Sequence, residues 1–242
     1  ASADLIVNNN RRPTFSKAFA QDTILTGQMT TLTFTIDNSL NGDAVSNINF
    51  SDNLPQGMVI AASPNITNSC AVGTVIGLVG SASFSVSNAS ILANSTCTYS
   101  VDVTIDKSKL IVNQSENLTS AVGNSGPSKD SIYVKIPEPI SFSASTLSHN
   151  AIGLTASPNA NNMDSILVAF SSDGVFGEPM GFLTSGNTIG GGGEVLYMGL
   201  ASGLPNHMGL TQSTKYYYKA WSYGYDLYSK QGLFASDTTL VD

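Results

Sequence analysis

The sequence predicts an all-β chain made of two tandem immunoglobulin-like or fibronectin type III-like β-sandwiches. Three observations carry this prediction: apolar and hydroxyl residues alternate with a period of two, turn signals recur at short intervals, and a Pro-rich break lies past the middle of the chain. No segment of a dozen residues combines apolar spacings of three and four with capping residues. Almost no helix is therefore expected.

The expected strands follow from alternation along the chain. Residues 31–36 alternate Leu, Phe and Ile with Thr, and residues 99–105 alternate Tyr, Val and Ile with Ser, Asp and Thr. The pattern returns over 132–136 and again from Ile140. Because successive side chains of a strand point to opposite faces, each strand is expected to bury its apolar side and expose its hydroxyls.

The domain boundary is expected at Pro137-Glu138-Pro139, since neither proline can donate a ladder hydrogen bond. Residues 1–11 are then an N-terminal extension, 12–136 an immunoglobulin-like domain, 137–139 a Pro-rich linker and 140–242 a fibronectin type III-like domain. Each half is long enough to bury a core of its own.

Composition narrows the classes of partner. Only 11% of the residues are charged, the net charge is -7, and the ten basic residues are scattered apart from Arg11-Arg12. Such a chain has little with which to neutralise phosphates, so nucleic acid is not an expected partner. No apolar run is long enough for a transmembrane helix and the first residues do not resemble a signal peptide, so membrane insertion is not expected and the chain reads as a mature or excised fragment.

The two cysteines, Cys70 and Cys97, are either a disulfide or two separate buried thiols. The even count, the few charges and the many hydroxyls favour an oxidising, extracellular setting and therefore the disulfide. Closure of the long loop between them should stabilise the domain by about 3.5 kcal/mol.

The first half resembles a bacterial surface-repeat family. The matching segments are PTFSKAFAQDTI (Pro13 to Ile24), TLTFTIDN (Thr31 to Asn38), FSDNLPQGMVI (Phe50 to Ile60) and STCTYSVDV (Ser95 to Val103). The family is a conserved repeat domain of unknown function found in long secreted proteins. The resemblance implies that its paired cysteines map onto Cys70 and Cys97.

The second half resembles a fibronectin type III-like module of secreted Bacteroidetes proteins. DSILVAFSSDGVFG (Asp164 to Gly177) and HMGLTQSTKYYYKAWS (His207 to Ser222) carry the resemblance. Leu210, Thr214 and Tyr216 keep the spacing of a tyrosine corner, in which the phenol hydroxyl bonds to nearby backbone. Both families imply spacer, stalk or display roles outside the cell.

No pattern predicts catalysis, a cofactor or a metal. The chain has two histidines, His149 and His207, and neither lies in a cluster with ligand or triad spacing; His207 is expected to be structural. The segment 37–43 matches part of a calcium loop but lacks the bidentate Glu, so a turn without an ion is favoured there. The expectation is a protein that is not an enzyme, with an accessory or catalytic part of a secreted hydrolase as a lesser alternative.

Alternation over 216–223 defines a candidate binding stripe on one face of a strand. The tyrosine corner assigns Tyr216, Tyr218 and Ala220 to the core, so the opposite face carries Tyr217, Lys219, Trp221 and Tyr223. Partly exposed rings could stack on a glycan or bury at a protein interface. The alternative is that the loops over 177–193 cover this stripe.

The functional prediction is a structural or display segment of an extracellular bacterial surface adhesin or filament, whose partners are neighbouring domains or subunits. The alternative is a glycan- or protein-binding module that uses the aromatic stripe. An Asp-Ser/Thr-apolar pattern, used for O-linked glycans in Bacteroidetes, makes three hydroxyl residues candidate modification sites: Thr23, Ser131 and Ser165.

Overall fold

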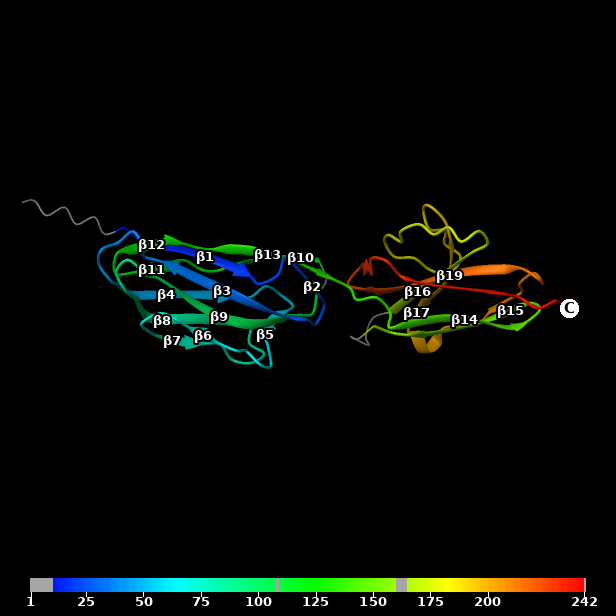
Figure 1. Ribbon diagram of the computed structural model, residues 1–242, viewed down its shortest axis with the longest axis horizontal. Coiled ribbons are helices and arrows are strands. Elements are labelled where there is room, and N and C mark those ends of the chain that lie inside the picture. The colour runs from blue at the N-terminus through cyan, green and yellow to red at the C-terminus, as the bar shows by residue number, and fades with distance from the viewer. Residues whose placement is uncertain (1–10, 108, 160–164, 242) are drawn as a thin grey trace, which may run out of the picture. The chain divides into compact units, whose positions relative to one another are not determined.

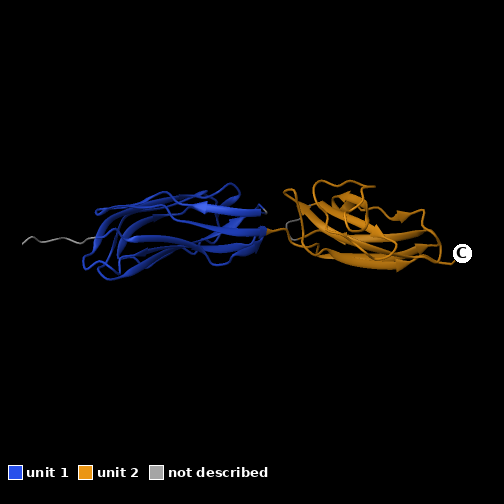
Figure 2. Ribbon diagram, turned by 90° about the horizontal axis from the view of Figure 1, so that it is seen from above, with its two compact units in different colours: residues 1–134 blue, residues 135–242 orange. Residues whose placement is uncertain are grey.

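The computed structural model describes residues 11–107, 109–159 and 165–241, and it is all-β as predicted. The chain divides into two compact units, Ala1–Val134 and Lys135–Asp242, called unit 1 and unit 2 below (Figure 2). The one helix in the described ranges is a 3-10 turn, η1, at Ala201–Gly203. No helix in those ranges is long and apolar enough to span a membrane.

Unit 1 is built from three antiparallel sheets (Figure 1). The first has the order β1-β3-β9-β5 with β6 also on β9, the second β10-β13-β2, and the third β12-β11-β4-β8-β7. The strands are β1 (Thr14–Phe19), β2 (Thr23–Leu25), β3 (Met29–Asp37), β4 (Val45–Asn53), β5 (Met58–Ile60), β6 (Thr67–Asn68), β7 (Val72–Ile76), β8 (Ser83–Ile91), β9 (Thr96–Ile105), β10 (Lys109–Gln114), β11 (Leu118–Ser120), β12 (Gly123–Gly126) and β13 (Lys129–Lys135).

The core of unit 1 follows from the alternation in the sequence. β3 pairs with β9 so that Leu32 lies opposite Val101 and Phe34 opposite Tyr99, and all four side chains are fully buried. Phe34 also stacks on Phe84 of β8, from another sheet, with ring centroids 5.3 Å apart. Aromatic contacts of this kind join the sheets face to face, as in a β-sandwich.

Unit 2 has two antiparallel sheets, β14-β15-β18 and β17-β16-β19-β20, with β21 also paired to β19. The ladders run through β16, whose residues 165–171 pair with residues 217–223 of β19. The strands are β14 (Ser141–Ser148), β15 (Ala151–Ser157), β16 (Ser165–Ser171), β17 (Glu194–Gly199), β18 (His207–Met208), β19 (Lys215–Gly224), β20 (Leu227–Tyr228) and β21 (Leu233–Thr238).

The middle of the second sheet, formed by β16 and the central part of β19, is buried on both faces. One face packs Ile166, Val168, Tyr218 and Ala220 against β14 and β15, as the alternation predicts for Tyr218 and Ala220. The other face forms a second cluster around Trp221, under the long connection between β16 and β17. A strand with apolar residues on both faces is typical of the middle of a covered sheet.

The tyrosine corner is present. The Tyr216 hydroxyl accepts a hydrogen bond of 3.1 Å from the backbone N–H of Thr211. The Pro-rich segment 137–139 is attached to unit 2, because both carboxylate oxygens of Glu138 accept backbone N–H groups, from Gln231 at 2.7 Å and from Gly232 at 2.8 Å. The contacts thus divide the chain between Val134 and Lys135, just before the predicted linker.

Candidate functional site

Trp221 is fully buried, so the prediction that Trp221 is partly exposed on a binding stripe is wrong. The alternative, coverage by the loop after β16, is the one observed. Phe176 of that loop meets the indole edge to face at 6.2 Å, and Ile189 and Leu183 pack in the same cluster. Lys219, which shares the face, lies over the ring with its ammonium 4.9 Å from the centroid.

Glycines let the covering loop fold tightly over Trp221. The backbone N–H of Gly177 donates to the carbonyl of Gly192, and a Cβ at Gly177 would overlap the carbonyl of Gly190. Strand alternation identifies the face of β19 on which Trp221 lies, but it carries no information on whether a distant loop covers that face. The packing of residues 172–193 therefore decided the exposure of the indole.

The other aromatic members of the stripe are half-buried. Tyr217 packs against Phe234, with ring centroids 6.0 Å apart, and Tyr223 lies 6.2 Å from Phe182. Phe182 is 72% exposed and its neighbour Met180 is 80% exposed. An apolar surface thus exists in unit 2, but loop residues dominate it and Trp221 is absent from it.

The candidate glycosylation positions are strand residues next to buried isoleucines. Thr23 on β2 and Ser131 on β13 are exposed, while Ser165, at the start of β16, is partly exposed. Asp164, which precedes Ser165, lies outside the described residues. Because Thr23 and Ser131 are exposed, both stay candidate glycosylation sites.

Cys70 and Cys97 form the predicted disulfide, with Cα atoms 4.9 Å apart. Cys97 lies on β9, and Cys70 follows β6, which pairs with β9. The bond therefore fastens the excursion from β5 to β8 onto the central strand of its sheet.

His207 is buried and makes structural contacts. Its Nδ1 lies 3.1 Å from the Tyr218 hydroxyl, and its ring lies 4.4 Å from that of Phe170. Desolvation lowers the pKa of His207 below its usual value, because burial disfavours the charged imidazolium.

The partial calcium-loop match at 37–43 is a hydrogen-bonded turn. The Asp37 carboxylate accepts from the backbone N–H of Ser39 at 2.8 Å and from the Thr96 hydroxyl at 3.1 Å, while the Asn38 amide donates to the carbonyls of Asp43 and Leu92. In the part of the chain that the structure describes, no three His, Cys, Asp or Glu side chains are grouped so that they could hold a metal ion.

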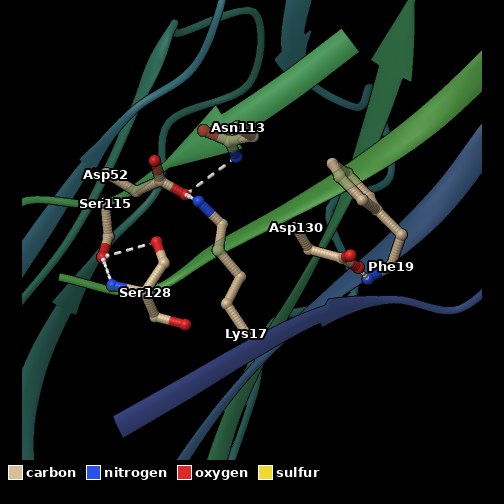
Figure 3. A network of polar contacts seen from close by, with 7 residues as sticks. All are labelled: Lys17, Phe19, Asp52, Asn113, Ser115, Ser128 and Asp130. Carbon is tan, nitrogen blue, oxygen red and sulfur yellow. Dashed lines mark hydrogen bonds and ion pairs between the residues drawn. The ribbon is translucent and has the colours of Figure 1, made fainter. Parts of the chain in front are cut away.

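Unit 1 contains a buried polar cluster that the sequence analysis missed. Lys17 of β1, Asp52 of β4 and Asn113 of β10 meet inside the sandwich (Figure 3), and the lysine and aspartate side chains are fully enclosed, as is Asn113. Each occupies an inward position of its strand, next to buried apolar residues two positions away. In the sequence, each appears as a charged or amide residue at a position where the alternation of its strand predicts a buried apolar side chain. That pattern could have identified all three.

The geometry of this cluster centres on one carboxylate oxygen. Lys17 Nζ lies 2.7 Å from Asp52 Oδ2, and the Asn113 amide donates to the same oxygen at 3.0 Å. Asp130 lies nearby and accepts the backbone N–H of Phe19 at 2.8 Å. Burial lowers the pKa of Lys17, although the Asp52 carboxylate opposes that shift.

The cluster is incompletely satisfied. Within the described ranges, Asp52 Oδ1 and Asn113 Oδ1 are buried without a hydrogen-bond partner, and Lys17 Nζ has none beyond its ion pair with Asp52. Buried polar atoms without partners are costly, and a buried ion pair is a weak source of net stability. Simple stabilisation of the fold does not explain why three such residues meet here.

Comparison with known proteins gives one family. The model of a domain of unknown function, DUF7933, matches residues 13–134. A comparison with curated proteins found no match.

Several solved structures resemble the chain at low identity. A two-domain fibronectin type III segment of chicken tenascin is 12% identical, with 95% of this chain and all of that chain covered and a TM-score of 0.45. The major pilin subunit BcpA of Bacillus cereus is 14% identical, with 96% and 65% covered and a TM-score of 0.40. The Yersinia pseudotuberculosis adhesin InvE is 13% identical, with 92% and 58% covered and a TM-score of 0.34.

Proposed function

This chain belongs to the DUF7933 family. We propose that it is a structural and display segment of an extracellular bacterial surface adhesin or filament. Its task is to hold its neighbours at a distance and to withstand load. Its partners are the adjoining domains or subunits of the same assembly.

The disulfide between Cys70 and Cys97 is the observation that carries this proposal. Disulfides persist in oxidising compartments and are rare in the cytosol, so the bond supports a location outside the cell. It also fastens a long surface excursion onto β9, and such a bond protects a segment from local opening.

Antibody labelling of intact cells of the source bacterium tests the proposal. We expect full labelling before lysis, and no reaction of the extracted, denatured and unreduced chain with a thiol reagent. Labelling that requires lysis, or two reactive thiols per chain, would contradict an extracellular role.

A second candidate function is binding, and the exposed apolar surface of unit 2 favours it. Met180 and Phe182 project from the loop after β16, and Phe182 contacts Tyr223. Exposed aromatic rings of this kind anchor glycans or proteins.

A glycan array probed with the whole chain tests this candidate. Binding that Phe182→Ser removes, and that Leu200→Ser leaves intact, supports it, because Leu200 is an exposed apolar residue of the same unit at another place. An array without signal, or equal loss in both variants, rejects a glycan site at Phe182.

A further inference from the structure

We propose that Lys17 and Asn113 become joined by an intramolecular isopeptide bond, formed without a cofactor and assisted by Asp52. The proposal concerns a covalent link inside unit 1, so it stands apart from the proposed surface role and is tested separately. It follows from the chemistry of three side chains that the fold encloses together.

The three residues supply a nucleophile, an electrophile and a proton carrier. An uncharged lysine amine is a strong nucleophile, and burial shifts Lys17 toward that form. The carboxamide carbon of Asn113 is the electrophile, and Cγ is bonded directly to the Nδ2 that touches Asp52 Oδ2. The carboxylate touches both partners, so it is placed to take a proton from one and give it to the other.

The reaction balances without any further reactant. Lys17 passes a proton from its ammonium to Asp52, and the free Nζ attacks Cγ of Asn113. A C–N bond forms, the Cγ–Nδ2 bond breaks, and Nδ2 leaves as ammonia after taking up a proton through Asp52. The lysine amine and the asparagine amide thus become one secondary amide and ammonia, and Asp52 ends protonated.

The enclosure favours this step in two ways. The reacting groups are held against one carboxylate, and fixed proximity of this kind accounts for much of the rate gain in intramolecular reactions. Water is excluded from side chains that are fully buried, so hydrolysis does not compete with the amine. The product also removes the buried ion pair, because the ammonium is consumed and Asp52 ends protonated.

The link would join strands that are far apart in sequence and lie in different sheets. Lys17 lies on β1, the first strand, and Asn113 on β10, which belongs to a different sheet and pairs with β13. No backbone ladder holds β1 to β10 among the described strands. A covalent bond there would close most of unit 1 into a single loop.

The mass of the reduced, denatured chain tests the proposal directly. We expect a mass about 17 Da below the sequence value, the mass of one ammonia. After digestion with a protease that cleaves at aromatic and leucine residues, a branched peptide should join Lys17 to Asn113. An unshifted mass overturns the proposal, and so does a 17 Da loss that maps to a succinimide at Asn41-Gly42.

Variants assign the roles. Asn113→Ala and Asp52→Ala should each restore the full mass and remove the branched peptide, while Lys129→Arg, at an exposed lysine of β13, should keep both. If a variant does not fold, the mass and peptide map of the unaltered chain still decide the question. A branched peptide at Lys17 that persists in Asn113→Ala would overturn the assignment of Asn113.

Discussion

Trp221 shows what a single residue contributes to unit 2. Its indole is fully buried under Phe176 and Ile189, on the face of the sheet opposite to Tyr218. The loop after β16 therefore packs on this side chain. On another segment, just before β21, Gly232 lets the backbone pass close to the indole. Its φ of +68° suits glycine, and a Cβ there would meet the indole nitrogen at 2.8 Å.

Trp221→Ala should lower the free energy of unfolding of unit 2 by about 3 to 5 kcal/mol, since a large buried ring leaves a cavity. Urea denaturation followed by circular dichroism measures the change. Tyr217→Ala is the matched control on the same face, and a half-buried ring there should cost clearly less. Equal losses in the two variants would show that the indole is not the anchor of the loop.

His207 should make unit 2 less stable as the pH falls. Its folded-state pKa is lowered by burial, so between the folded and the unfolded pKa the unfolded chain binds more protons. The stability is fully present above about pH 6.5, the unfolded value, and is lost as the pH falls below it. Urea midpoints of unit 2 measured from about pH 7 to about pH 5 should therefore decline.

His207→Phe provides the control for that dependence. The variant keeps a ring against Phe170 and loses the titrating group, so its midpoint should stay flat over the same range. The lowered pKa of Asp237, whose carboxylate accepts the backbone N–H groups of Thr238 and Thr146, affects stability only below about pH 4. A decline that persists in His207→Phe would assign the effect to other groups.

At the scale of elements, the disulfide should contribute only to unit 1. Cys70 and Cys97 are 27 residues apart in sequence, and closing a loop of this length is worth about 3.5 kcal/mol on the chain-entropy estimate. The double variant Cys70→Ser/Cys97→Ser should lower the midpoint of unit 1 and leave that of unit 2 unchanged. A shift of both transitions would indicate that the two units unfold together.

The strands were predictable where alternation is regular. Residues 31–36 and 99–105 became the paired strands β3 and β9, with their apolar side chains fully buried. The tyrosine corner was also predictable, because it depends on the local spacing from Leu210 to Tyr216. Local rules are sufficient for such features.

The cluster of Lys17, Asp52 and Asn113 was not predicted, because it depends on contacts among three strands far apart in sequence. Each residue alone is an ordinary polar residue near a strand. Only the topology shows that their inward positions coincide. The sequence left the exposure of Trp221 open between a partly exposed ring and a ring covered by the loop over 177–193, because alternation within one strand does not show whether a distant loop packs on it.

The chain consists of two sandwich units, and two covalent links would hold unit 1 together. The disulfide holds β9 to the segment after β6, and the proposed amide bond joins β1 to β10. Force applied through the ends of the chain would enter unit 1 at β1 and leave it after β13. The amide bond would then carry the load past the strands between Lys17 and Asn113.

Stretching single molecules of the whole chain by its two ends tests whether a covalent bond shields unit 1 from load. Unit 2 should unfold in a step of roughly 350 Å, as expected for about 100 residues pulled straight. Unit 1 should release no more than about 100 Å, because the residues between Lys17 and Asn113 stay outside the path of the load. A second step of roughly 300 Å from unit 1 of the unaltered chain would contradict a bond between Lys17 and Asn113.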